Sequence, residues 1–388
     1  MAVDGPWTKL HAVGCADPRG TKPLRNHRGE LIAGRRRVPA EEHRIMSLPA
    51  RDALVRPHSL RPSLLGLLAA HAFVVLFLSV INIVAPQRGG PLALSQIFAP
   101  LLSLSLVALV PVALRSPGRG FRVALFIGLA ISVMRFGSGL VSIPPQPPGA
   151  DELIVRVMTW NLEGDASMPD AVLAHLRASD ADVVALQELT PAYAVAIQMD
   201  RDLTMRYREM ALVPRGGADG IGVLSRFPIT SATHDLNPAI QEIELSFSDR
   251  ELTIINAHPL APRFPLGQAA WDRLGYDARQ RDVDIRRIRG SIDRALAMRR
   301  SVIVLGDFNV TDREPAFDDL ARGLWDAHEE VGQGFGSTWR PSQVAFVPLG
   351  LLRIDHFLGG PGTRPLRVVE DCTPLSDHCI LEGDVAVD

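Results

Sequence analysis

The chain has 388 residues and a formal net charge of −2, from 41 Lys and Arg against 43 Asp and Glu. Its 47% hydrophobic content excludes an intrinsically disordered protein, and its three Cys are too few for a disulfide scaffold. The near-neutral total conceals an asymmetry. Residues 1–150 hold 17 basic and 6 acidic side chains, whereas residues 151–388 hold 24 basic and 37 acidic ones. This split predicts two parts with different surroundings.

Residues 1–62 are polar and rich in Arg, with scattered Pro and Gly. This composition predicts a basic, disordered cytoplasmic tail. A solvated face is the simpler interpretation of the run Arg35–Arg37, and a nucleic-acid patch is the alternative. We expect Met46 to be the first residue of the natural protein, because no periodic pattern precedes it.

Residues 63–143 contain three apolar runs, Ser63–Ala85, Leu92–Leu114 and Phe121–Ile143. A membrane-spanning helix needs about 20 mostly apolar residues, so each run is long enough. The third run contains Arg135, which we expect to face other helices or an interface. The pattern predicts three transmembrane helices, and buried helices of a soluble protein are the alternative.

Arginines flank the first run and fill the loop between the second and third runs, whereas the first loop carries only Arg88. The positive-inside rule then puts the N-terminus in the cytoplasm and everything after the third run outside the cytoplasmic membrane. Residues 144–152 form a stiff, Pro-rich linker, which keeps residues 153–388 within roughly 20 Å of the bilayer.

Residues 153–388 alternate short β-branched runs with helical patterns, which predicts an α/β or α+β domain. Helices are expected at residues 169–178, 277–300 and 315–324. Strands are expected at residues 153–160, 182–187, 220–225, 241–247, 252–257, 302–305, 353–358 and 379–387.

Polar side chains follow several of these strands, in the segments TWN, LQE, NAHP, GDFN, RIDH and SDH. Side chains at the mouth of a sheet can converge on one site. Carboxylate and amide oxygens suit Mg²⁺ or Mn²⁺, while His side chains serve acid–base work. The residues concerned are Asn161, Glu188, Asn256, His258, Asp307, Asn309, Asp355, Asp377 and His378.

In this order, these segments resemble the endonuclease/exonuclease/phosphatase (DNase I-like) superfamily over about residues 153–386. The resemblance implies a four-layer αββα sandwich, here preceded by the three transmembrane helices. It implies a metal-dependent phosphoric ester hydrolase that uses Mg²⁺ (or Mn²⁺). The layout also resembles membrane-bound bacterial members of the superfamily, some of which are proposed to act on polyprenyl phosphates.

The resemblance also implies roles for single residues. Glu188 is the principal metal ligand, with Asn161 and Asp377 near the metal. His258 donates to the phosphate, and Asp307 with Asn309 aligns or deprotonates the attacking water. Asp355 orients His378, which contacts the scissile phosphate. The choice between Asp307 and His378 as the base stays open.

Three further residues are candidates for substrate contact: Asn256, Arg226 and Arg263, the last in an insertion-like loop beside the His258 motif. Arg226 lies in the segment GVLSRFP, which resembles a family strand segment; a structural role is its simpler interpretation, and approach to a phosphate is the alternative. Thr338 and Trp339 are expected to pack. Cys372 and Cys379 flank the SDH segment, and a disulfide between them is one alternative outside the cytoplasm.

The sequence therefore favours a membrane-anchored hydrolase with its catalytic domain outside the cytoplasm, acting on phosphoesters that include lipid-linked phosphates. A membrane-anchored Mg²⁺-dependent nuclease is the second hypothesis. It ranks lower because residues 151–388 contain no Lys and carry excess negative charge. A catalytically inactive membrane scaffold is the third.

Overall fold

The structure, a computed structural model, describes residues 62–115, 118–137, 145–149, 151–164, 168–247, 250–263, 275–342 and 346–388. The tail predicted for residues 1–62 lies almost wholly outside these ranges, and so does most of the insertion-like loop after Arg263. Leu60–Asp388 forms one compact unit.

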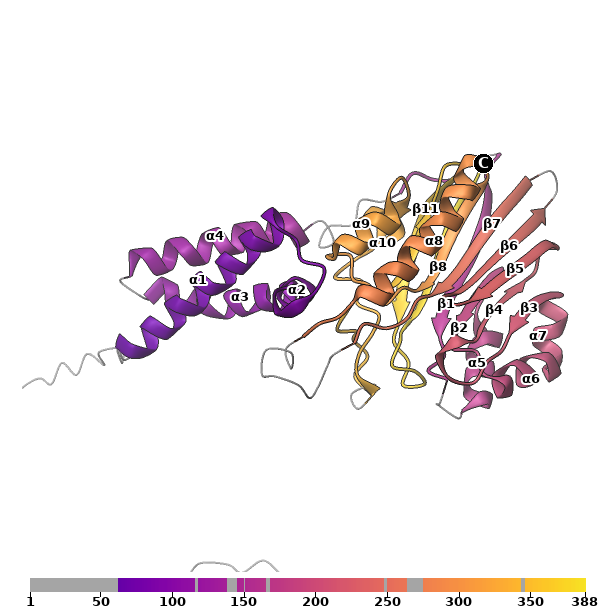
Figure 1. Cartoon of the computed structure of the whole chain (residues 1–388), viewed down its shortest axis with the longest axis horizontal. Helices are drawn as coiled ribbons and strands as arrows, with labels where there is room; N and C mark the ends of the chain where they lie inside the picture. Colours follow the sequence, from indigo (N-terminus) through magenta and orange to yellow (C-terminus); the bar gives the residue numbers. More distant parts are fainter. Residues whose placement is uncertain are drawn as a thin grey trace, which may run out of the picture. The chain divides into compact units, whose positions relative to one another are not determined.

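Two six-stranded sheets dominate the second half of the chain (Figure 1). The first has the order β11-β12-β1-β2-β4-β3 and the second β5-β6-β7-β8-β10-β9. The strands of the first sheet are β1 (Leu153–Asn161), β2 (Val183–Gln187), β3 (Glu209–Val213), β4 (Ile221–Ser225), β11 (Thr363–Asp371) and β12 (Ile380–Val387). Those of the second are β5 (Ile229–Leu236), β6 (Ala239–Phe247), β7 (Arg250–His258), β8 (Ser301–Asp307), β9 (Trp325–Asp326) and β10 (Asp355–Gly359).

The alternation of apolar side chains along the strands produces four layers. In β1, Val155 and Val157 enter a core shared with the second sheet, whereas Met158 and Trp160 face helices. Because successive side chains point to opposite faces, a central strand such as β1 contributes to two cores. One outer layer consists of α5 (Pro169–Ala178), α6 (Pro191–Met199) and α7 (Arg201–Arg206). The other contains α8 (Arg279–Ala297) and α9 (Pro315–Ala321), while α10 (Ala327–Val331) packs on β10 and β11.

This two-sheet α/β sandwich confirms the predicted fold of the domain, and each predicted strand and helix is present with end shifts of a few residues. The prediction missed β3, β5, β9 and β11, together with α6, α7 and α10. Strands β5 and β11 have much exposed surface, so their sequences lack the dense apolar runs that marked the central strands.

The first half of the described chain holds α1 (Pro62–Val84), α2 (Gly90–Ile97), α3 (Ala99–Arg115) and α4 (Arg119–Phe136). Within the described residues, one helix is long and apolar enough to cross a membrane, over Leu64–Val84. The pair α2 and α3 is a second candidate only as a span bent by 63°. Three spanning helices are therefore not shown, and α4 falls short because three Arg occupy its 18 residues.

The second apolar run is broken near Phe98, where α2 ends. The break coincides with Pro100, the second residue of α3. Proline disfavours a helical conformation in the residue before it and lacks the N–H that a continuous helix needs. Residues 92–97, the start of the expected span, therefore belong to a separate helix, α2.

Residues 145–149 of the Pro-rich linker are exposed and irregular. Arg364 of β11 donates to the carbonyl oxygens of Gln146 and Pro147 at 2.9 and 3.1 Å. The same guanidinium pairs with Glu152, so the linker is held against the edge of the first sheet.

Candidate active site

The candidate residues meet at one edge of the sandwich because both sheets contain a parallel pair there. β1 pairs in parallel with β2, and β7 with β8. The carboxyl ends of parallel strands meet at the same edge of a sheet. Asn161 and Glu188 therefore lie beside each other at the end of the first pair, and His258 and Asp307 at the end of the second.

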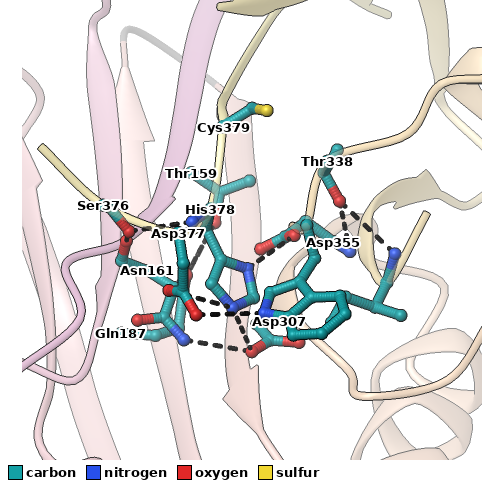
Figure 2. A network of polar contacts seen from close by, with 12 residues as sticks. Thr159, Asn161, Gln187, Asp307, Thr338, Asp355, Ser376, Asp377, His378 and Cys379 are labelled. Carbon is teal, nitrogen blue, oxygen red and sulfur yellow. Dashed lines mark hydrogen bonds and ion pairs between the residues drawn. The ribbon is translucent and has the colours of Figure 1, made fainter. Parts of the chain in front are cut away.

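Asp307 is contacted from several sides, and Figure 2 shows its contacts with Asn161 and His378. Its Oδ2 accepts a hydrogen bond from Asn161 Nδ2 at 3.0 Å, across the two sheets, and lies 3.3 Å from His258 Nε2 and 3.5 Å from His378 Nε2. Its Oδ1 accepts from the Asn309 backbone N–H at 2.9 Å. The carboxylate is thus fixed by groups from four different segments.

The electrostatics of this cluster favour an anionic Asp307 between two protonated imidazoles. Burial disfavours the charged form of His378, but the carboxylates of Asp355 and Asp307 overcome it and raise its pKa to about 10. Burial likewise opposes the charge on His258, and Asp307 outweighs it so that the pKa of His258 is raised. Burial alone would raise the pKa of Asp307, yet the two histidines hold it below its usual range.

Asp355 fixes His378 on the side of the ring away from Asp307, because Asp355 Oδ2 lies 2.9 Å from His378 Nδ1. Both side chains are almost fully buried. The Asp355 backbone N–H donates to Thr338 Oγ1 at 3.1 Å, and the His378 backbone N–H donates to Ser376 Oγ at 3.0 Å. With Nδ1 engaged, the Nε2 side of the ring is left to face the site.

Glu188 and Asp377 lie near this cluster on more accessible positions. Glu188 has a positive φ of 54°, and its side chain accepts from Asn161 Nδ2 at 3.1 Å and from the Gly164 N–H at 3.0 Å. Asp377 Oδ2 accepts from Trp339 Nε1 at 3.1 Å, and its backbone N–H donates to Glu163 Oε2 at 3.0 Å. Burial raises the pKa of Asp377.

These side chains open into one cavity of about 430 Å³. Seven of the residues predicted for the site, or found to hold it, line the cavity: Glu163, Glu188, His258, Asp307, Asn309, Asp377 and His378. Carboxylates dominate its polar lining, and no Lys or Arg occurs among the described residues that line it.

The donor set fits a hard divalent cation. Glu163, Glu188, Asp307 and Asp377 supply carboxylate oxygens around one cavity, and such oxygens are the preferred ligands of Mg²⁺ and Mn²⁺. The tightest group of candidate ligand atoms in the described residues is a different one, formed by Asp307, Asp355 and His378. Asp355 is buried behind His378 and hydrogen-bonded to it, whereas Glu188 and Asp377 line the cavity and could hold a cation there.

Three residues predicted to contact substrate do not line this cavity. Asn256 is fully buried, and its amide donates to backbone carbonyls of the other sheet and accepts from Gln187, so it links the two sheets. Arg226 follows β4, which runs antiparallel to β2, and therefore lies at the opposite edge, paired with Asp182 at 3.0 Å. Arg263 is exposed and pairs through its backbone with Asp277.

Glu163 was not among the predicted site residues. Trp339 was expected only to pack, but its indole N–H also donates a hydrogen bond to Asp377. Both contact Asp377, although they lie 214 and 38 residues from it in the chain. The positive φ of Glu163 (48°) belongs to the turn after β1 and has no signature in the sequence. Cys372 and Cys379 form a disulfide, which was one of the two alternatives expected for this pair.

A sequence profile described as the Endonuclease/Exonuclease/phosphatase family matches residues 158–378. No curated protein matches the chain. Among solved structures, a humanized TDP2 of D. rerio is 18% identical with a TM-score of 0.49, covering 60% of this chain and 98% of its own. An endonuclease/exonuclease/phosphatase from Bacteroides vulgatus is 16% identical with a TM-score of 0.47, covering 61% and 100%. The human Nocturnin catalytic domain with bound sulfate is 18% identical with a TM-score of 0.43, covering 63% and 100%.

Proposed function

The chain belongs to the endonuclease/exonuclease/phosphatase family, and from this premise we propose that it is a divalent-metal-dependent phosphoester hydrolase. The observation that carries the proposal is the convergence of Asp307 with His258 and His378 beside the oxygen ligands of one cavity. Hydrolysis of a phosphoester requires an aligned water and compensation of the charge on the phosphoryl oxygens, and this site offers groups for both.

The metal is assigned to Glu188, with Asn161 and Asp377 as its neighbours. Bound there, the cation supplies Lewis-acid stabilisation of the negative charge that develops on the phosphoryl group. Glu188 is suited to this position because its side chain is part-exposed to the cavity and accepts only two hydrogen bonds within the described residues.

The protonation states of Asp307, His258 and His378 indicate the role of each side chain. Asp307 stays ionised because its pKa is depressed, and it orients the attacking water together with Asn309. His378 and His258 are protonated, and they donate hydrogen bonds toward the phosphoryl oxygens. Asp355 stabilises the imidazolium of His378 and keeps its Nε2 directed at the site. His378 therefore acts as a donor, and the depressed pKa of Asp307 supports Asp307 as the base.

We place the protein in the cell membrane with its catalytic domain outside the cytoplasm. The Arg-rich tail before α1 favours a cytoplasmic N-terminus, and a single crossing by α1 then puts the domain outside. The disulfide between Cys372 and Cys379 supports this placement, because disulfides persist in oxidising compartments.

Near a bilayer, the domain meets lipid head groups at high effective concentration, so lipid-linked phosphates are the first candidate substrates. Nucleic acid ranks second. Proteins that bind it use many Lys and Arg contacts to phosphates, and the described lining of the cavity contains neither residue.

A substrate panel on the purified full chain tests the proposal. We expect hydrolysis of a polyprenyl pyrophosphate or of bis-p-nitrophenyl phosphate with Mg²⁺ or Mn²⁺, and little cleavage of DNA. Asp307→Ala and His378→Ala should abolish detectable turnover, whereas Asp371→Asn, at an exposed strand end, should not change it. Wild-type turnover in either site variant would refute the assignment. Failure to bind Mg²⁺ or Mn²⁺ in calorimetry would favour the inactive scaffold, and a C-terminal reporter found in the cytoplasm would overturn the topology.

A further inference from the structure

One wall of the catalytic cavity is built by α2, a segment outside the residues that the family profile matches. Leu94, Ile97 and Phe98 line the cavity, and their spacing of three and four residues puts them on one face of the helix. Ile97 is buried, whereas Leu94 and Phe98 are only half-buried. The cavity therefore has carboxylates and histidines on one side and unpaired apolar surface on the other.

The apolar surface continues onto the catalytic domain. Leu260, Ala261, Pro262, Leu352 and Ile354 line the same cavity. Ala93 and Ile97 pack with Tyr276 and Ala278 in a small core, and Leu94, Phe98 and Leu352 pack against its edge. The helix thus completes a pocket that is mostly hydrocarbon beyond the reacting centre.

Polar contacts hold α2 in this position. Gly90 donates its N–H to the Tyr276 carbonyl at 2.8 Å, and the fully buried Gln96 donates its side-chain amide to the Arg313 carbonyl at 2.5 Å. Just before the helix, Arg88 forms an ion pair with Asp319 at 2.8 Å. These contacts fix α2, whose Leu94, together with Phe98 directly after it, packs against the small core and also lines the cavity.

Tyr276 is itself rigidly placed. Its hydroxyl donates to Glu314 at 2.7 Å, and Arg281 contacts both groups from α8. All three side chains are buried. Since the Tyr276 carbonyl accepts from Gly90, this buried cluster fixes the start of α2 relative to the domain.

We infer that α2 is a specificity element, and that Leu94 and Phe98 bind the hydrocarbon chain of the alcohol part of the phosphoester. The inference rests on the proposed function for the position of the phosphate. It adds that the substrate is an ester of an apolar alcohol, with the chain beginning next to the phosphate. A charged or sugar-like group at that position would lose its hydration against this wall without gaining a polar partner.

The test measures binding rather than turnover, so that it does not depend on hydrolysis. Octylphosphonate and propylphosphonate carry the same head group, and their C–P bond is not a phosphoester. With the full chain in detergent and Mg²⁺, calorimetry should show octylphosphonate binding at least about tenfold more tightly, since each fully buried methylene is worth about a fourfold change in affinity.

Two variants of the same helix separate the wall from the micelle. Leu94→Ser should reduce the ratio of the two affinities by about fivefold or more, because it replaces apolar wall with a hydroxyl. Leu92→Ser changes an exposed Leu of α2 that does not line the cavity, and it should leave the ratio unchanged. Equal affinities in the wild type, or equal losses in both variants, would overturn the inference.

Photolabelling answers the question in the unaltered protein if Leu94→Ser does not fold. Octylphosphonate with a diazirine at its chain end should label residues 90–98, and excess octylphosphonate should compete the label away. Labelling confined to α3 or α4 would contradict the inference. Tighter binding of the longer alkyl chain without hydrolysis of any phosphoester would contradict the proposed function alone. Hydrolysis without a preference for the longer alkyl chain would contradict only the role of α2.

Discussion

Replacing Asp355 by Asn tests the part assigned to the pair that it forms with His378. The two side chains are 2% and 5% exposed, and Nδ1 of the imidazole lies 2.9 Å from the carboxylate. An Asn side chain has nearly the same shape and keeps an oxygen that can accept this hydrogen bond. The substitution therefore removes the negative charge with little change in packing.

The magnitude follows from the burial of the pair. A hydrogen bond to a charged group is worth about 1.5–3 kcal/mol, and each 1.4 kcal/mol in the barrier is about tenfold in rate. If the imidazolium of His378 stabilises the transition state more than the bound substrate, kcat should fall by about 10- to 150-fold. KM should change much less, because Asp355 does not line the cavity.

The assay is steady-state hydrolysis of whichever ester the wild type turns over, with Asp371→Asn as the matched control at an exposed site. The proton resonance of His378 Nδ1–H, measured by NMR, reports on the pair directly and should shift or vanish only in Asp355→Asn. An unchanged kcat in a folded Asp355→Asn variant would refute the role of the pair, and a loss confined to KM would show that it serves substrate binding instead.

Three further predictions concern metal, disulfide and stability. EDTA should abolish activity and Mg²⁺ restore it, whereas Glu188→Gln should need much more Mg²⁺ for half-maximal rate; metal-independent turnover would contradict this. Cys372→Ser should lower the free energy of unfolding by about 2–3 kcal/mol, because the bond to Cys379 closes a short loop, and should reduce activity as that loop loosens; an unchanged melting curve would argue against the bond. Asp326→Asn should cost about 3–5 kcal/mol, since Asp326 and Arg353 form a buried two-point ion pair at 3.0 and 2.6 Å. Arg353 holds the pKa of Asp326 down against burial, so its stabilisation is present above the unfolded pKa of about 3.9 and lost at lower pH. Unfolding curves should therefore show the gap between wild type and Asp326→Asn narrowing as the pH falls below about 4, and a constant gap would be inconsistent with the pair.

Local patterns predicted most of the site because its residues terminate strands. Asn161, Glu188 and Asp307 each follow a buried apolar run, and parallel pairing of the strands brings such ends together. Arg226 also follows a strand, yet it lies away from the site. β4 runs antiparallel to β2, so its end lies at the other edge of the sheet, and the direction of a strand is not encoded in its own residues.

The apolar runs show a similar division. Length and hydropathy identified α1 as a candidate span, but they could not distinguish a straight second span from α2 and α3 bent by 63°. Gln96 of α2 bonds to the Gln87 N–H in the loop before the helix and to the Arg313 carbonyl far away in the chain, and the energies of these bonds do not appear in a hydropathy profile.

By itself, the sequence determined the α/β class of the domain and the chemical types gathered at the site, because strand periodicity and the residues that end each strand are local properties. The layered sandwich was implied by the family resemblance. Only the tertiary structure decided which polar residues face the cavity, that Asn256 joins the sheets, and that α2 supplies an apolar wall. Those outcomes depend on strand direction and on contacts between segments hundreds of residues apart, which only the packed chain brings together.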